Sequence, residues 1–372
     1  MFFKVSKREL LNGLNIVSRA ISNYSPLPAF SGIKFNVNET DICLMASDSD
    51  ISIKTYLSAR DEYHLEIIRT GSIVIEAKYI LDIVRKMDTD IIEIEVADGC
   101  NVKISDENSE FNIIGMYANE YPLIDFDKSE DFFTIGSTEL KKIINQTIFA
   151  TSDKDTRPYL NGINFFIDGD NVECTATDSY RLAKTSFKIN KSFNYNIIIP
   201  AKSLNELMKS LDEDKEIEVY LSNKKVLFIV DNTTIQTRLI DGKFPDTKQL
   251  IPESFAYELQ LDIRDILGSI DRVSFIKNDG VNIIKLDLNS EESILSSKSQ
   301  DIGSAIETLR TAQFTGDNLS ISFNGRYVFE AIKAINSSTI VFKFSGEMKP
   351  FIIQGVEDDK VLQLVLPVRT YL

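Results

Sequence analysis

The chain has 372 residues, of which 43% are hydrophobic and 26% charged, and its 56 acidic and 41 basic residues give a net charge of −15. This length exceeds that of an ordinary domain and predicts two or three domains, while the negative charge disfavours a surface that adheres to nucleic acid throughout. The single histidine, His64, lies in the polar stretch DEYHLEI without a nucleophile motif nearby, which disfavours Ser-His-Asp or Cys-His catalysis.

The N-terminal stretch is charged where a secretory signal would be apolar, with Lys4, Lys7 and Arg8 among its first residues. No apolar run approaches the ~18 residues of a membrane-spanning helix. The cysteines are odd in number and lack metal-ligand spacing, as is typical of small buried side chains in a reducing compartment; they are Cys43, Cys100 and Cys174. We therefore expect a cytoplasmic protein without membrane contacts, metal or cofactor.

Apolar residues at helical spacing predict six short amphipathic helices, two in each third of the chain. In chain order, their apolar stripes begin at Leu10, Ile80, Leu140, Leu204, Ile266 and Val328. Four of the helices have residues typical of N-terminal caps, namely Ser6 in the capping box SKRE, Ser137, Asp262 and Asn324.

Segments that alternate between apolar and polar residues lie between these helices and predict strands in antiparallel meanders. Examples are residues 92–96, 112–116, 216–221, 225–230, 234–239 and 283–288. Short polar turns are expected to join strands, as at Asp98-Gly99 and at Asp168-Gly169-Asp170. Each third of the chain is thus predicted to be an α+β unit with two helices on one face of antiparallel sheet.

Two short patterns recur at intervals of one third of the chain and indicate three tandem repeats. An aromatic or aliphatic residue precedes Pro122, Pro245 and Pro367, and a turn of small residues occurs at 46–49, at 176–179 and, in a weaker form, at 296–299. We expect three domains of one fold, at residues 1–125, 126–252 and 253–372.

The polar faces of the six expected helices carry an excess of Lys, Arg, Asn and Gln, whereas acidic residues gather in connections such as DGDNVE and LDEDKEIE. For a single helix, a solvated surface explains such a face. The same bias on six helices indicates a basic surface on an acidic body, which is the electrostatic footprint of phosphate binding. Because no base-reading motif accompanies it, we expect contacts to a nucleic-acid backbone and not to its sequence.

Over its whole length the sequence resembles the bacterial β sliding clamps, the processivity subunits of the replicative DNA polymerase, DNA polymerase III. The strongest matches are TRPYLNGI at 156–163, TATDSYRLA at 175–183, IIPAKSLNELMKSL at 198–211, LIDGKFPDTKQLIP at 239–252, FNGRYVFEAIKAI at 323–335 and LVLPVR at 364–369. The resemblance implies a non-catalytic, head-to-tail homodimer, a ring of six similar domains whose helices line a hole around duplex DNA and whose sheets lie outside. A ring holds DNA by topology, so weak phosphate contacts that permit sliding are expected.

In this family, edge strands of the first and third domains pair across the dimer interface. The resemblance therefore implies that Phe111 and Ile113 lie near Val273 and Phe275 of the other subunit. A place in an ordinary core is the alternative for these residues.

The family also has a peptide-binding cleft between the second and third domains, used by the polymerase, the clamp loader and other DNA enzymes. Its aliphatic, proline and methionine side chains form a socket for hydrophobic anchors of a partner, and Thr177, Ser179 and Arg181 are expected to supply donors at the rim. Matched by motif, the cleft residues are Leu160, Thr177, Ser179, Tyr180, Arg181, Leu182, Pro245, Leu250, Met348, Pro350, Leu366, Pro367 and Val368.

The turn of the first repeat, SDSDIS, has Asp50 and Ile51 where the second has Tyr180 and Arg181. We therefore expect both turns to have one shape but only the second to carry recognition chemistry. Asp178 is present in both copies, and hydrogen bonds from its side chain to the local backbone explain it better than partner binding does.

The DNA contacts that the resemblance implies are Tyr24, Lys78, Lys154, Tyr159, Lys202, Asn324 and Tyr327. Family members often have a basic residue at the place of Tyr24 and an aromatic residue at that of Pro158, so individual contacts transfer less securely than the basic lining. The chain also continues through residues 370–372, where some members stop sooner.

Two other classes of function remain open. An enzyme acting on nucleic acid would need a metal-binding carboxylate cluster, a phosphate-binding glycine loop or a usable histidine, and the sequence contains none of these patterns. The other alternative is an adaptor built from repeats that never touches DNA. Retention on nicked circular plasmid, lost when the plasmid is linearised, would discriminate against such an adaptor.

Overall fold

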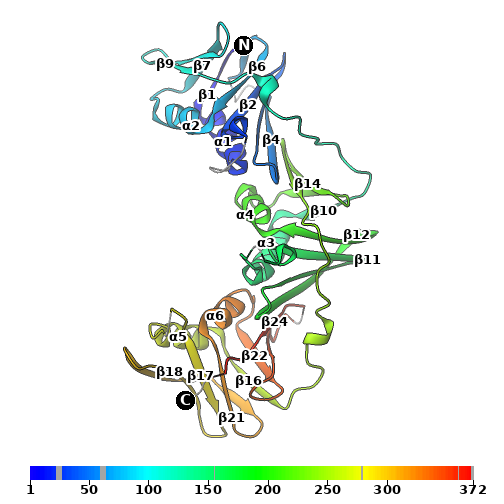
Figure 1. The fold of residues 1–372 in the computed structure, drawn as a ribbon, viewed down its shortest axis with the longest axis vertical. Coiled ribbons are helices and arrows are strands. Elements are labelled where there is room, and N and C mark those ends of the chain that lie inside the picture. Colours follow the sequence, from blue (N-terminus) through cyan, green and yellow to red (C-terminus); the bar gives the residue numbers. More distant parts are fainter. Residues whose placement is uncertain (22–26, 59–63, 155, 278–279, 359, 370–372) are drawn as a thin grey trace. The chain divides into compact units, whose positions relative to one another are not determined.

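The computed structural model describes residues 1–21, 27–58, 64–154, 156–277, 280–358 and 360–369 (Figure 1). Tyr24, an expected DNA contact, and the tail at 370–372 lie outside the described residues. The chain forms two compact units, one of Met1–Thr138 with Lys202–Leu239 and one of Glu139–Ala201 with Ile240–Leu372. The middle third of the sequence is thus shared between the two units.

Helices are present at all six expected places, and their apolar stripes are buried. Leu10, Leu14 and Val17 of the first helix, for example, have no exposed surface. Within the described residues the helices are α1 (Lys7–Val17), α2 (Ala77–Lys86), α3 (Ser137–Thr147), α4 (Ala201–Ser210), α5 (Ile263–Val273) and α6 (Gly325–Lys333).

Within its described residues, the first unit contains a five-stranded and an eight-stranded sheet, both antiparallel. The smaller sheet has the order β5 (Glu66–Arg69), β1 (Phe2–Ser6), β7 (Ile91–Val96), β8 (Asn101–Ser105), β9 (Glu110–Ile114). The larger has the order β10 (Phe132–Gly136), β13 (Glu216–Leu221), β14 (Lys225–Val230), β15 (Thr233–Arg238), β4 (Ile51–Ser58), β3 (Asp41–Ser47), β2 (Gly32–Val37), β6 (Gly71–Glu76). Because β15 pairs with β4, strands from the first and middle thirds share one sheet, and the hydroxyls of Thr55 and Thr233 lie 2.8 Å apart across that pairing.

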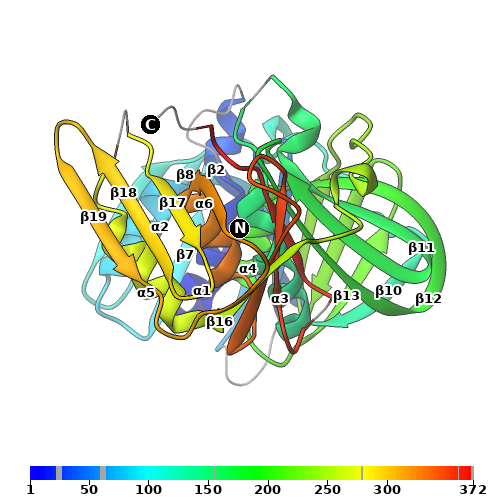
Figure 2. The same ribbon diagram turned by 90° about the horizontal axis from the view of Figure 1, so that it is seen from below.

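The second unit is organised in the same way. A seven-stranded sheet has the order β11 (Gly162–Thr177), β12 (Arg181–Pro200), β24 (Leu362–Val365), β23 (Phe351–Gly355), β22 (Thr339–Phe344), β16 (Tyr257–Asp262), β20 (Gln313–Thr315). A four-stranded sheet has the order β19 (Gly303–Thr308), β18 (Ser293–Ser299), β17 (Ile283–Leu288), β21 (Leu319–Asn324). Figure 2 shows β11 and β12 as a long curved pair, and α5 beside β17 and β18. Apolar residues of α5, α6 and both sheets form one core, which includes the neighbouring rings of Phe323, Phe342 and Phe351.

Three local expectations are wrong. The chain does not turn back at Asp168-Gly169-Asp170, because β11 runs through these residues with a change of register after Gly169, whose φ of +65° suits glycine. The weaker turn expected at 296–299 lies inside β18. Ser6 precedes α1 without a capping hydrogen bond from its side chain.

Of the other three predicted cap residues, two cap their helices and one does not. Asp262 and Asn324 cap α5 and α6, since their side chains accept hydrogen bonds from the backbone N–H groups of Arg264 (2.7 Å) and Arg326 (3.0 Å). Ser137 is instead the first residue of α3, and its hydroxyl accepts a hydrogen bond from the backbone of Lys215.

Candidate functional site

The turn between β11 and β12 is fixed by hydrogen bonds from side chains to its own backbone. Asp178 Oδ1 accepts from the N–H groups of Tyr180 (2.8 Å) and Arg181 (3.0 Å). Thr177 Oγ1 accepts from Ser179 N–H and donates to the carbonyl of Arg181, and Ser179 has a φ of +79°. The turn directs the ring of Tyr180 outward, 55% exposed, and the side chain of Arg181 inward, 7% exposed.

The turn between β3 and β4 has the same hydrogen bonds. Asp48 Oδ1 accepts from the N–H groups of Asp50 (3.1 Å) and Ile51 (2.9 Å), and Ser47 Oγ accepts from that of Ser49, whose φ is +84°. The predictions that the two turns share a shape, and that the shared aspartate serves the local backbone, are therefore confirmed. The turns differ in the side chains they present, Asp50 and the buried Ile51 in the first, Tyr180 and the buried Arg181 in the second.

The structure corrects the role expected for Arg181. Its guanidinium lies between the rings of Phe149 (5.2 Å from the ring centroid) and Tyr327 (4.5 Å). Nε donates to Asp178 Oδ2 at 3.0 Å and Nη1 donates to Glu330 Oε2. Because these donors are directed into the protein, Arg181 anchors the turn and is not a donor at an open rim.

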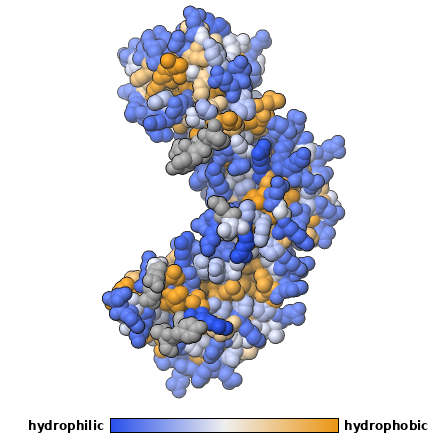
Figure 3. Space-filling model, viewed as in Figure 1, coloured by the Kyte–Doolittle hydropathy of each residue, from blue (hydrophilic) through white to orange (hydrophobic). Residues whose placement is uncertain are grey.

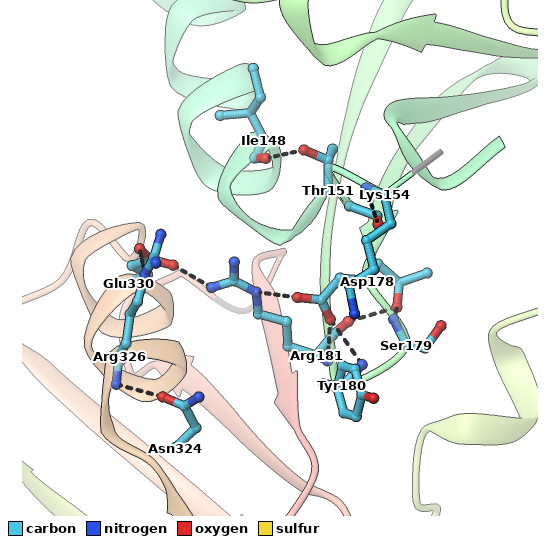
Figure 4. A network of polar contacts seen from close by, with 12 residues as sticks. Ile148, Thr151, Lys154, Asp178, Ser179, Tyr180, Arg181, Asn324, Arg326 and Glu330 are labelled. Carbon is cyan, nitrogen blue, oxygen red and sulfur yellow. Dashed lines mark hydrogen bonds and ion pairs between the residues drawn. The ribbon is translucent and has the colours of Figure 1, made fainter. Parts of the chain in front are cut away.

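Glu330 on α6 completes this network. Its Oε1 accepts a hydrogen bond from Arg326 Nε at 2.8 Å, while Oε2 accepts from Arg181 (Figure 4). Burial raises the pKa of Glu330, but the hydrogen bonds from Arg181 and Arg326 outweigh burial and leave this pKa below its ordinary 4.5. The carboxylate is therefore ionised at neutral pH. Glu330 was not among the residues predicted from the sequence, although its spacing of four residues from Arg326 on a helix is typical of an ion pair.

Apolar residues expected in the cleft form a buried floor beside this turn. Leu182 packs with Ile352 and Leu364 in a small cluster, against which Leu366 is packed. Leu160 is buried in a second cluster with Ile198 and Phe244.

The C-terminal segment is pinned to the same place. The N–H of Leu366 donates to the carbonyl of Tyr180 (2.9 Å), and that of Val368 donates to the carbonyl of Ser322 (2.7 Å). Leu366, Pro367 and Val368 are half-buried, and so is Pro350, which precedes β23. The structure thus brings the tail, the floor and the turn together.

The other expected cleft residues are accessible. Leu250 is 50% and Met348 52% exposed, and Pro245 is exposed as well. Exposed apolar side chains of this kind can contact the hydrophobic anchors of a peptide. Ser179 is also exposed, and its hydroxyl accepts a hydrogen bond from Arg157 at 2.9 Å.

The expected DNA contacts fall into two groups. Lys78, Lys154 and Lys202 are exposed, although Lys202 Nζ lies 2.6 Å from Asp48 Oδ2. The others that the structure describes are half-buried and have structural roles: Tyr159 packs against the cluster of Leu160, Asn324 caps α6, and Tyr327 covers the guanidinium of Arg181.

Several basic residues on the polar helix faces form ion pairs. Lys86 pairs with Asp82, and Arg272 pairs with Glu307. An ion pair as exposed as that of Lys86 contributes at most ~1 kcal/mol to stability. A phosphate can therefore replace the carboxylate as the partner of such a lysine at little cost in free energy.

The expectation that Val273 lies at the dimer interface is wrong, because this residue has no exposed surface and belongs to the core of the second unit. Phe111 (37%) and Phe275 (62%) are exposed, and Ile113 is half-buried. Three further exposed residues were not predicted from the sequence, namely Ile114 on β9 (81% exposed) and, in the second unit, Ile302 and Ile306.

Phe111, Ile114 and Ile306 lie on strands at sheet edges. β9 and β19 are the last strands of their sheets. Figure 3 shows apolar side chains gathered near β9 and α2, and again near α5 and β18, on a mostly hydrophilic surface. Exposed apolar edges are sites where a further strand can add.

Among the residues that the structure describes, no helix is long and apolar enough to cross a membrane. Nowhere in the same residues do three His, Cys, Asp or Glu side chains gather as metal ligands would.

Comparison with known proteins gives one consistent result. Models of the DNA polymerase III beta subunit match the chain along its length, the N-terminal domain at residues 1–125, the central domain at 134–246 and the C-terminal domain at 248–369. The beta sliding clamp of Staphylococcus epidermidis is 38% identical over 376 residues, with 100% of both chains covered.

Solved structures agree with the sequence matches. The Bacillus subtilis DNA polymerase sliding clamp superposes with a TM-score of 0.96 at 36% identity, covering 100% of both chains. The fold is also shared by a Pseudomonas aeruginosa sliding clamp solved with bound griselimycin, at 23% identity, a TM-score of 0.92 and 100% coverage of both chains.

Proposed function

Because the chain belongs to the DNA polymerase III β-subunit family, the bacterial β sliding clamps, we propose that it is a DNA sliding clamp that acts as a ring-shaped homodimer. The ring encircles duplex DNA without reading its sequence. It tethers the replicative polymerase, the clamp loader and other DNA enzymes, which makes synthesis processive. It is cytoplasmic and performs no catalysis itself, and its three domains are residues 1–125, 126–252 and 253–372.

The observation that carries this proposal is that the C-terminal tail is hydrogen-bonded to the turn between β11 and β12. Tyr180 is exposed and Leu182 is buried, and the N–H of Leu366 is hydrogen-bonded to the carbonyl of Tyr180. A peptide with hydrophobic anchors would pack on this floor, and each anchor would contribute ~1–3 kcal/mol. Griselimycin, the ligand in the Pseudomonas clamp, is proposed to bind here as well.

Ring closure is proposed to join edge β9 of one copy to edge β19 of the next. Such a contact would cover Phe111 and Ile114 on one side, and Phe275 and Ile306 on the other, all of which are exposed in the single chain. A head-to-tail contact that closes after two copies leaves no sheet edge open at either junction.

The test of encirclement is retention of the purified protein on nicked circular plasmid after loading, compared with the same plasmid linearised. A clamp is retained on the circle and slides off the linear form. Equal loss from both forms would contradict a ring, and equal retention on both would indicate ordinary DNA binding.

The cleft is tested by replacing Leu366 and Val368 with alanine together. Binding of fluorescein-labelled griselimycin should be lost, while sedimentation should still report a dimer, because neither residue belongs to β9 or β19. Unchanged griselimycin affinity would exclude the cleft assignment.

A further inference from the structure

The helices α4 and α6 carry the same charge pattern at their N-termini. A cation stands second in each helix, Lys202 and Arg326, and a glutamate follows four residues later, Glu206 and Glu330. In the first unit the lysine binds its turn directly, since Lys202 Nζ lies 2.6 Å from Asp48 Oδ2. In the second unit, two intermediate side chains connect the cation to the equivalent aspartate.

This connection runs without a break from the surface to the turn (Figure 4). Arg326, with 74% of its side chain exposed, donates to Glu330, which is 26% exposed. Glu330 accepts from the buried Arg181, and Arg181 donates to Asp178 at 3.0 Å. Asp178 in turn accepts a hydrogen bond from the N–H of Tyr180.

One carboxylate is therefore shared between two guanidinium groups. With Arg326 bonded to Oε1 of Glu330, Arg181 is bonded to this carboxylate through Oε2 alone. If a phosphate binds Arg326, Glu330 can offer both oxygens to Arg181, because an arginine and a carboxylate prefer a bidentate contact. Arg181 is buried and packed between two rings, so a firmer hold on its guanidinium restrains the backbone of the turn.

We propose that Arg326 is a regulatory residue whose contact with a DNA phosphate releases Glu330 to Arg181 and so tightens binding of hydrophobic peptides in the cleft. This rests on the proposed function, since α6 must face the DNA and the turn must line the cleft. Linkage is reciprocal, so a peptide in the cleft strengthens the hold of Arg326 on DNA by the same factor.

The first experiment needs no DNA and uses the whole dimeric protein with fluorescein-labelled griselimycin as the probe. Arg326→Ala frees Glu330 permanently and should raise affinity about fivefold, at the low end of measured couplings. Lys333→Ala is the matched control, because Lys333 lies on the same helix with its Nζ over the ring of Phe329. Glu330→Gln should lower affinity, and in that background Arg326→Ala should have no effect.

A merely structural role of Arg326 would not produce this dependence on Glu330. An unchanged affinity in Arg326→Ala, an equal gain in Lys333→Ala, or an undiminished effect of Arg326→Ala in the Glu330→Gln background would each overturn the proposal.

The second experiment compares griselimycin binding to the free protein and to the protein loaded on nicked circular plasmid. The wild type should bind about fivefold more tightly on DNA, and Arg326→Ala should not respond to DNA. Equal affinity of the wild type on and off DNA, or a full response of Arg326→Ala, would overturn the coupling. Failure of the wild type to stay on the plasmid, or to bind griselimycin at all, would instead refute the proposed function.

Discussion

Replacing Val273 with alanine separates core packing from dimer formation at the end of α5. The side chain has no exposed surface, so the change removes two buried methyl groups and leaves a small cavity. At ~0.8 kcal/mol for each buried carbon, with a cavity term of similar size, the second unit should lose about 2–3 kcal/mol of stability. Phe275→Ala is the matched change on the surface, and it should cost less than about 0.5 kcal/mol.

Hydrogen exchange at the α5 amides measures the local free energy of opening, and sedimentation across a dilution series measures dimer dissociation. Val273→Ala should accelerate exchange in α5 about 30- to 150-fold, the factor that 2–3 kcal/mol implies, and leave dimer dissociation unchanged. Phe275→Ala should do the reverse. If Val273→Ala weakened the dimer and left α5 exchange unaltered, the assignment of Val273 to the core would be refuted.

Three further changes test other parts of the structure. Gly162→Ala should lower the midpoint of urea unfolding, because a Cβ there would lie 2.4 Å from the carbonyl oxygen of Ile199. The control Gly136→Ala should leave this midpoint unchanged, because no atom lies within 4 Å of a Cβ at that position. Equal midpoints of the two variants would contradict the close packing of β11 and β12. Burial raises the pKa of the Cys174 thiol well above its ordinary 9.0, so iodoacetamide at pH 8 should label the half-buried Cys100 first, as peptide mass mapping would show. Because the pKa of Glu330 is lowered in the folded protein, its ionised form stabilises the fold fully above pH 4.5, and this contribution is lost as pH falls through the lowered pKa. The free energies of unfolding of the wild type and of Glu330→Gln, measured by denaturation, should therefore converge in acid. A difference that stays constant with pH would refute this prediction.

The helices and the repeated turn were predictable because both are encoded locally. A stripe such as Leu10, Leu14 and Val17 specifies a buried helix face whatever packs against it. The turn is specified by Thr177 and Asp178, whose side chains bond to backbone groups within four residues. Local signals of this kind survive in a sequence without knowledge of the fold.

Contacts between distant segments were not predictable. Val273 and Phe275 are two residues apart and both apolar, and only the packing of α5 on its sheets makes the first buried and the second exposed. The position of Arg181 depends on Phe149 and Glu330, which lie far from it in the sequence. Likewise, polar residues at 168–170 suggested a turn, but the length of the facing strand β12 allows β11 to continue past Gly169.

The pairing of β15 with β4 has a consequence for how the protein is made. Strand β4 leaves the ribosome early, yet its neighbour in the sheet ends only at Arg238. At 5–20 residues per second, translation of the intervening chain takes on the order of ten seconds. During that interval the hydrogen-bonding edge of a nascent N-terminal fragment stays bare, and a second nascent chain on the same messenger could pair with it. Spacing between translating ribosomes should therefore affect the yield of this protein more than that of one whose sheets close in sequence order.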